Sequence, residues 1–410
     1  MQASNAQNDA HTTRTVAGVD TSTMRALAGA AVVMGLGQTT LLTFLPMLMQ
    51  MTGLSLPRVT TAFALGSGLF LIGAPFWSRC SDAWGRRRVV VIALCGFAIS
   101  HGLLLWQLLR HDAGWSGHFA LLIAGRVLYG LTVSGLVPTC QAWLADASSS
   151  SQRLRVMSRF SAGLALGRLI GPVMAAGSLA LGWLGPVWLV ALAPWPALLL
   201  LARVRKPVTR DSHSDAASGS MPWRALAPWL LMALLMQASL GQVQYAVGPW
   251  LQTVFALTPT RVALELGWML SVCAALMIVL QLWVVPRCRP GRAVLVVGAT
   301  ALVATGVAFA LAPLLPAMLG IWSGFALLAV ASALLVPTYS TLASFAAGGN
   351  RQSRAAAALA MTHTCGFSLA AVVAAGLFGL MPAAPFWLVA LLGCVSVAIA
   401  VACDRPVRAE

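Results

Sequence analysis

Residues 72–91 read IGAPFWSRCSDAWGRRRVVV, in which a short charged turn separates two long apolar segments. The turn holds one aspartate, Asp82, one glycine, Gly85, and three consecutive arginines, Arg86 to Arg88. Basic residues gather in the cytoplasmic loops of membrane proteins. This explains the three arginines but not the aspartate or the glycine. Glycine permits a tight turn where a side chain would clash. Asp82 and Gly85 at this spacing therefore predict a specialised turn between two membrane spans.

The composition predicts a membrane protein along the whole chain. Of its 410 residues, 59% are hydrophobic and only 9% are charged, which is too few to cover a soluble domain with solvated groups. A helix needs about 20 apolar residues to cross the hydrocarbon layer, and twelve such runs follow one another. We expect spans near residues 24–50, 59–79, 89–109, 119–145, 157–181, 185–202, 226–255, 264–285, 293–312, 317–345, 355–380 and 385–403.

The basic residues predict the orientation of these spans. In this arrangement 21 of the 26 basic residues lie on the side that holds both termini, and the opposite loops hold only Arg58, Arg110 and Arg261. The positive-inside rule therefore predicts cytoplasmic termini. The net charge of +16 then reflects topology and contact with anionic lipid, and it does not indicate nucleic-acid binding.

A hydrophilic stretch at residues 203–225 divides the spans six and six. We interpret it as a flexible cytoplasmic linker. The predicted organisation is a disordered cytoplasmic tail at 1–23, an N-terminal six-helix bundle at 24–202, the linker, a C-terminal six-helix bundle at 226–403 and a short cytoplasmic tail at 404–410.

Short sequence motifs that recur in the second half of the chain indicate that the two halves are related. The word LVPT at residues 136–139 recurs at 335–338, an offset of 199, and Gly37-Gln38 recurs as Gly241-Gln242. The charged turn has a second copy at residues 287–292 that lacks the aspartate. Repeats of this kind predict a pseudo-symmetric pair of bundles.

Asp82, Gly85 and the three arginines match the D-x-x-G-R-[RK]-[RK] loop between the second and third spans of the major facilitator superfamily, which this chain resembles. The resemblance implies an all-α membrane fold with two six-helix bundles and transport by alternating access. It also implies that the loop gates the cytoplasmic side, with Asp82 near the start of the eleventh span and Arg86 reaching Asp146. The gating residues implied are Gly73, Asp82, Gly85, Arg86, Arg87, Arg88 and Asp146.

Two further stretches resemble the proton-driven exporters of that superfamily. Arg126 is followed four residues later by Gly130, as in the buried arginine motif that proton-coupled members carry in the fourth span. The fifth span resembles the G-x-x-x-G-P element usual in exporters, and glycines every fourth residue leave a groove for a neighbouring helix. These helix-packing residues are Gly163, Gly167, Gly171 and Pro172. The resemblance implies an antiporter that uses a proton gradient and no cofactor or metal.

The centre of the predicted membrane domain departs from the drug exporters of the family, because no Asp or Glu lies well inside any span. Arg126 and Arg168 do lie inside, where a charge is costly unless it faces protein or water. Aligning Ser158-Arg159 with Ser353-Arg354 places Arg168 opposite His363. The candidate substrate-binding and proton-coupling residues are Gln38, Arg126, Arg168, Gln242, Gln244, Tyr245, Tyr339 and His363.

The proton carrier stays open between His363, Asp82 and the substrate itself. Histidine titrates nearest neutrality. His101, by contrast, we interpret as a packed group without a role.

A cavity with two fixed positive charges favours anionic or polyhydroxylated solutes over cations. The segments GRVLYGLTVSGLVPTCQAWLAD and SAGLALGRLIGPVMAA resemble those of bacterial exporters of alcaligin and of citrate-based carboxylate siderophores. We therefore predict a monomeric siderophore exporter of the bacterial inner membrane, whose partners are a small-molecule substrate, protons and lipid. The alternative is a multidrug or antibiotic efflux pump. A membrane enzyme acting on lipids is disfavoured, since the sequence shows no cluster of nucleophiles, metal ligands or carboxylates.

Overall fold

The structure is a computed structural model that describes residues 20–110, 115–148, 150–204, 220–348 and 351–402, and every regular element within them is helical. Twelve helical segments are long and apolar enough to cross a membrane, which confirms the predicted number. The helices of the first half are α1 (Thr21–Thr52), α2 (Leu56–Trp84), α3 (Arg86–Leu109), α4 (His118–Val133), α5 (Leu136–Ala147), α6 (Ser150–Ser178), α7 (Gly185–Leu192) and α8 (Pro194–Ala202). Those of the second half are α9 (Trp223–Phe255), α10 (Pro259–Trp283), α11 (Arg292–Leu311), α12 (Ala317–Ala347), α13 (Gln352–Leu380) and α14 (Ala384–Ala402).

The predicted segment boundaries differ from the structure by a few residues. Helix α1 begins three residues before the predicted start at 24, and α9 begins three residues before 226. Most of the predicted tails and the centre of the linker, residues 1–19, 205–219 and 403–410, lie outside the described residues.

Two of the spans consist of two helices each, because proline interrupts the backbone hydrogen bonds. Pro138 has no N–H to donate to the carbonyl of Ser134, and the helix breaks there between α4 and α5. Near this break the indole N–H of Trp77 donates to the carbonyl of Leu131, in the last turn of α4. The break between α7 and α8 falls directly before Pro194.

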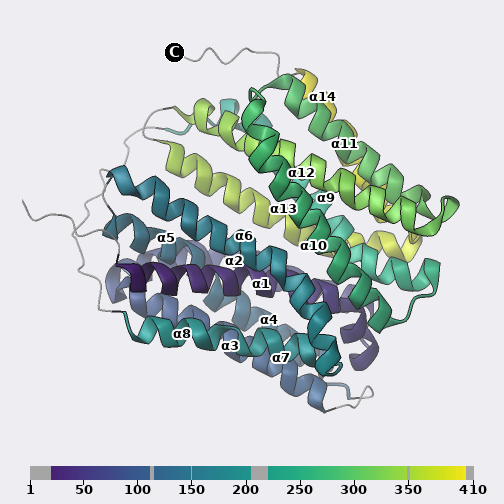
Figure 1. Cartoon of the computed structure of the whole chain (residues 1–410), viewed down its shortest axis with the longest axis horizontal. Coiled ribbons are helices and arrows are strands. Elements are labelled where there is room, and N and C mark those ends of the chain that lie inside the picture. The colour runs from purple at the N-terminus through teal and green to yellow at the C-terminus, as the bar shows by residue number, and fades with distance from the viewer. Residues whose placement is uncertain (1–19, 111–114, 149, 205–219, 349–350, 403–410) are drawn as a thin grey trace, which may run out of the picture.

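The chain forms two six-helix bundles (Figure 1). The first bundle, from α1 to α8, is purple to teal, and the second, from α9 to α14, is green to yellow. The same pairing recurs in both, because α1 packs along α6 and α9 packs along α13. Since the number of spans is even, α1 begins and α14 ends on one side of the molecule, which we name the terminus side.

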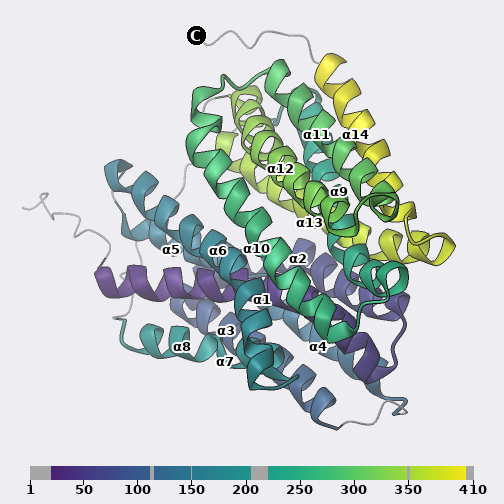
Figure 2. The same ribbon diagram turned by 45° about the vertical axis from the view of Figure 1, so that its right-hand side comes forward.

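The two bundles contact each other at the ends away from the terminus side. There a Cβ added to Gly248 of α9 would lie 2.9 Å from the Pro46 ring of α1, and the ring of Phe63 in α2 lies 6.4 Å from that of Tyr245 in α9. Toward the terminus side the helix ends of the two bundles diverge (Figure 2). The molecule is therefore closed at one end and spread at the other.

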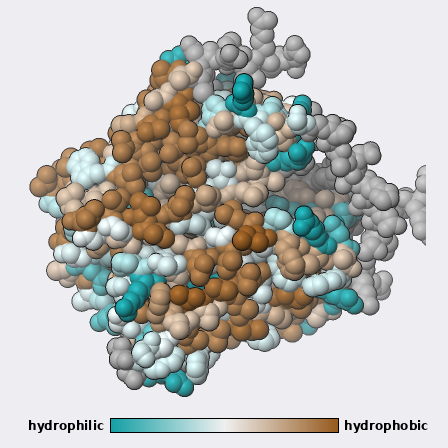
Figure 3. All heavy atoms as spheres, turned by 180° about the vertical axis from the view of Figure 1, so that it is seen from behind, coloured by the Kyte–Doolittle hydropathy of each residue, from teal (hydrophilic) through white to brown (hydrophobic). Residues whose placement is uncertain are grey.

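The outer surface of the bundles is largely apolar, as one face shows in space-filling view (Figure 3). Large apolar side chains point outward from many helices, among them Ile72 at 70% exposure and Leu199 at 65%. Apolar exposure on this scale is characteristic of a surface in contact with lipid or another apolar partner. The polar groups of interest lie inside the bundles and at the helix ends.

Candidate functional site

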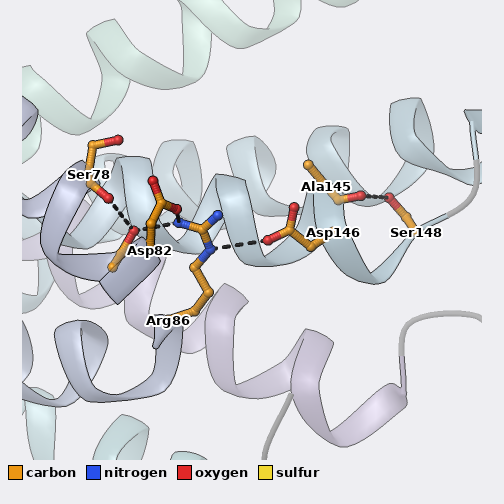
Figure 4. Close-up of polar contacts among 7 residues, drawn as sticks. Ser78, Asp82, Arg86, Ala145, Asp146 and Ser148 are labelled. Atoms are coloured by element: carbon orange, nitrogen blue, oxygen red, sulfur yellow. Dashed lines mark hydrogen bonds and ion pairs between the residues drawn. The ribbon is translucent and has the colours of Figure 1, made fainter. Parts of the chain in front are cut away.

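The charged turn forms an ion-pair network at the terminus side (Figure 4). Arg86 is the first residue of α3, and its Nη1 lies 2.6 Å from Asp82 Oδ1 at the end of α2. Its Nε donates to Asp146 Oδ2 at 3.1 Å, near the end of α5. Nη1 also donates to the hydroxyl of Ser81. The predicted pair of Arg86 and Asp146 is therefore present, and one guanidinium joins the ends of three helices.

Asp82 lies at the end of α2, beside Arg86. Its side chain is 65% exposed, and within the described residues its ion-pair partner is Arg86. A contact between Asp82 and α13 stays a prediction for a conformation closed at the terminus side.

The other gating candidates have structural partners of their own. Gly85 has a φ of 92°, a left-handed conformation that favours glycine, and open space around it. A Cβ on Gly73 would overlap the Ser134 hydroxyl, so α2 requires glycine where it meets the break after α4. Arg87 donates to the carbonyls of Ala202 and Val204, each at 3.1 Å, and caps the end of α8. Arg88 is exposed.

The predicted glycine groove on α6 holds α1. A Cβ on Gly163 would lie 2.9 Å from the Ala28 carbonyl oxygen. A Cβ on Gly167 would overlap the Val32 carbonyl oxygen, and a Cβ on Gly171 would overlap Thr39 Oγ1. Pro172 lies inside α6 directly after this groove. Its carbonyl faces α10 of the other bundle, where a Cβ on Gly267 would lie 2.8 Å away. The α6 glycines therefore set the backbone distance within the first bundle.

The two intramembrane arginines have different surroundings. Arg126 in α4 is 4% exposed, and its guanidinium carbon lies 5.1 Å from the ring centre of Phe63 and 5.2 Å from that of Tyr129. Arg168 in α6 is exposed, and its Nε donates to Gln38 Oε1 of α1 at 2.9 Å. Among the described residues, neither forms an ion pair with a carboxylate. One arginine is thus enclosed by aromatic rings and the other is accessible.

The second bundle presents neutral polar groups. The hydroxyl of Tyr339 in α12 lies 2.7 Å from His363 Nε2 in α13 and also hydrogen-bonds Gln237 in α9. His363 lines a hollow of about 250 Å³ together with Ser340, Ser344, Gln352, Ala356, Leu359 and Ala360. This hollow reaches the start of α13 on the terminus side. Arg168 is near enough for its charge to act on the His363 ring.

The remaining glutamines and Tyr245 lie on α9. Gln242 is 1% exposed, and its Oε1 has no hydrogen-bond partner among the described residues. Gln244 is partly exposed. Tyr245 is buried at the contact between bundles, with its ring 5.3 Å from that of Phe367 in α13.

Gly167 and Gly366 make similar helix crossings. A Cβ on Gly167 would meet Val32 O and Leu36 N of α1, and a Cβ on Gly366 would meet Leu234 O and Ala238 N of α9. Each glycine therefore allows close approach of the partner helix in its own bundle. The equivalence of Arg168 with His363 stays a prediction.

Sequence reasoning missed two polar residues of this region. Gln237 forms a hydrogen bond with Tyr339. The sequence feature that could have indicated it is a glutamine within an apolar span. His101 lies beside Arg126, since both contact the Tyr129 ring. Its signal was weak, because a single histidine in a span is commonly a packed group.

The family profile described as Major Facilitator Superfamily matches residues 27–371. A probable triacylglyceride transporter of Mycobacterium leprae is 34% identical over 115 residues, which are 28% of this chain and 21% of the relative. Multidrug resistance protein 2 of Bacillus subtilis is 27% identical over 125 residues, 30% of this chain and 28% of the relative. The aligned part is therefore less than a third of either relative.

Solved structures of low sequence identity have the same fold. The xylose transporter XylE from E. coli, in a partially occluded inward open conformation, matches with a TM-score of 0.71 and 14% identity over 94% of this chain and 99% of that chain. A bacterial homologue of the human lysosomal transporter Spinster, inward-facing and occupied, matches with a TM-score of 0.67 and 16% identity over 92% and 93%. Since the family profile also spans most of its sequence, this chain belongs to the major facilitator superfamily.

Proposed function

We propose that the protein is a proton-driven secondary active exporter of a siderophore or a related anionic, polyhydroxylated metabolite. As a member of the superfamily it is a transporter of small molecules and not an enzyme. The observation behind the substrate class is Arg168, an accessible arginine within a span whose hydrogen-bond partner is the neutral Gln38.

The charge balance of the membrane interior supports an anionic substrate. The four described carboxylates, Asp20, Asp82, Asp146 and Glu265, all lie toward span ends, and Glu265 pairs with Arg261 at 2.9 Å. Neither intramembrane arginine has an internal counter-ion among the described residues. A carboxylate or hydroxamate ligand can accept two hydrogen bonds from one guanidinium. Such a ligand offsets the cost of the charge, whereas a cation adds to it.

Alternating access is supported by the contacts between bundles. They lie at the ends away from the terminus side, while Asp82 and the hollow beside His363 are accessible from the terminus side. We further propose that the termini are cytoplasmic, that the protein is a monomer of the bacterial inner membrane, and that this conformation faces inward. The basic residues of the terminus side supply the argument for orientation.

A multidrug or antibiotic efflux pump is the second candidate function. It is favoured by the similarity to multidrug resistance protein 2 of Bacillus subtilis. The aromatic side chains of Phe63, Tyr245 and Phe367 would allow a planar apolar ligand. Export of a neutral lipid is suggested by the mycobacterial relatives, but such a substrate offers no negative charge to the two intramembrane arginines.

The test uses everted membrane vesicles that contain the protein and a radiolabelled citrate-based siderophore. We expect uptake into the vesicles that requires the proton gradient and stops when an uncoupler is added. A strain that lacks the gene should retain the labelled siderophore in its cytoplasm. Proton-driven uptake of an uncharged antibiotic, with none of the siderophore, would replace this proposal by the efflux candidate.

A further inference from the structure

A second polar cluster lies inside the first bundle, between α3 and α4. His101 in α3 is completely buried, and its ring stacks on Phe97 with the ring centres 4.1 Å apart. Its Nδ1 lies 2.8 Å from the Phe97 carbonyl oxygen. A carbonyl only accepts, so Nδ1 bears the hydrogen and Nε2 of the neutral ring bears the lone pair. That Nε2 has no hydrogen-bond partner in the described part of the chain.

Arg126 brings an unpartnered donor to the same cluster. Its Nη2 contacts the hydroxyl of Ser100 at 3.4 Å, and its Nε has no partner among the described residues. Tyr129 joins the two groups, since its ring lies 5.6 Å from that of His101 and 5.2 Å from the guanidinium carbon. A buried polar atom without a partner is costly. A free acceptor and a free donor in one cluster therefore indicate a site with a function beyond packing.

We propose that His101 is the proton-binding site that couples export to the proton gradient, which rests on the proposed proton-driven function. A proton from water binds the Nε2 lone pair and converts the imidazole to imidazolium. The same proton later returns to water on the other side of the membrane. No other bond forms or breaks in this step, and one positive charge is gained and then lost.

The surrounding charges make this step depend on conformation. The titratable and charged groups around the cluster are Arg126 and Tyr129 on α4, Arg168 on α6 and Tyr245 on α9. None of these is a carboxylate, and a second positive charge beside Arg126 is repelled. Protonation of His101 therefore disfavours the present position of the Arg126 guanidinium. Proton binding selects a conformation in which the guanidinium has moved.

The cluster contacts both the other bundle and the accessible arginine. The Arg126 guanidinium packs on Phe63, and Phe63 in turn meets Tyr245 of the second bundle. On the other flank, a Cβ on Gly37 would overlap the Phe97 ring on which His101 stacks. The next residue, Gln38, accepts the hydrogen bond of Arg168. Movement of the bundles and occupation of Arg168 thus both act on the surroundings of His101.

The test measures how pH shifts the balance of conformations in the protein itself. Spin labels at Arg203 and Ala402, exposed at helix ends in different bundles, report by double electron–electron resonance how far the bundles diverge. In lipid vesicles, lowering the pH from about 8 to about 5 passes the pKa of an unperturbed histidine. For the wild-type protein we expect the ratio of the two conformations to change by about fivefold or more.

Three variants decide the assignment. His101→Asn keeps an N–H near Phe97 O but has no Nε2, and His101→Phe keeps the stacked ring, so either variant that inserts normally should lose the response to pH. His363→Gln should keep it. A normal response in the His101 variants would overturn this site, and loss in His363→Gln alone would assign the proton to His363. A wild-type protein without any response would contradict proton coupling itself.

Discussion

The two bundles share their packing but differ in their chemistry. Gly167 and Gly366 meet the partner helices α1 and α9 with the same pair of backbone atoms, four residues apart. Yet both intramembrane arginines belong to the first bundle, while the second presents Tyr339 and His363. The difference teaches that a duplicated scaffold can keep similar helix crossings while its halves differ in chemistry, with charged groups inside one bundle and neutral hydrogen-bonding groups inside the other.

The turns at the terminus side show the same division. Arg86 in the first bundle binds two carboxylates, Asp82 and Asp146. Arg287 in the second copy donates to the Trp283 carbonyl and lies over its indole ring, 6.0 Å from the centre. The network of Arg86 with Asp82 and Asp146 is one that a change of conformation could exchange.

The largest expected effect compares these two turns. Asp82→Asn should nearly abolish transport of the citrate-based siderophore, because the neutral amide loses the pair with Arg86 and the proposed contact with α13. The amount of protein in the membrane should not change. As a comparison in the second turn, Arg287→Ala should leave the transport rate close to normal. Wild-type rates in Asp82→Asn would end the gating role.

The next effect concerns Arg168, the accessible arginine of the first bundle. Arg168→Ala should raise the KM for the carboxylate siderophore by about 100-fold, because hydrogen bonds to charged groups contribute about 1.5–3 kcal/mol. Arg168→Lys should lie between alanine and wild type, since lysine keeps the charge but not the fork. Initial rates in vesicles measure both. An unchanged KM in Arg168→Ala would remove this arginine from the substrate site.

A smaller effect concerns the shared packing. Gly167→Ala should lower the stability by about 1–3 kcal/mol, because its Cβ would overlap the Val32 carbonyl and force α1 from α6. Gly376→Ala in the second bundle is the control, since nothing lies within 4 Å of its added Cβ. Thermal unfolding in detergent compares the two. Equal unfolding temperatures would show that the α6 groove tolerates a methyl group.

The smallest effect concerns the neutral side. Tyr339→Phe removes the hydroxyl between Gln237 and His363 and should raise the KM by a few-fold, in line with about 0.5–1.5 kcal/mol for a neutral hydrogen bond. A loss as large as that in Arg168→Ala would mean that the second bundle, and not the first, dominates binding. The same vesicle assay provides this comparison.

Local features of the sequence were enough to predict the membrane spans and the charged turn between the second and third spans. The length of an apolar run decides whether a helix can cross a membrane, so all twelve spans were predictable. The pair of Arg86 and Asp146 was expected from the resemblance to the superfamily loop, together with Asp146 as the acidic residue after the fourth span. The α6 groove followed from glycines at a spacing of four.

The missing parts depend on which helices meet. Burial of His101 comes from Phe97 and Tyr129, and the second of these lies on another helix. The role of Gln237 depends on Tyr339 of α12. The close contacts of Gly167 and Gly366 depend on the backbones of α1 and α9, which meet them at the helix crossings. A local sequence pattern does not predict any of these properties, because each depends on residues of another helix.

The proposed selection of anions by Arg168 is tested most directly by competition between an anionic and a cationic substrate. Everted vesicles with the wild-type protein are given equal concentrations of a radiolabelled carboxylate siderophore and of ethidium, a lipophilic cation. We predict uptake of the siderophore, no measurable uptake of ethidium, and loss of this preference in Arg168→Ala. Uptake of ethidium by the wild-type protein at a rate equal to that of the siderophore would contradict anion selection.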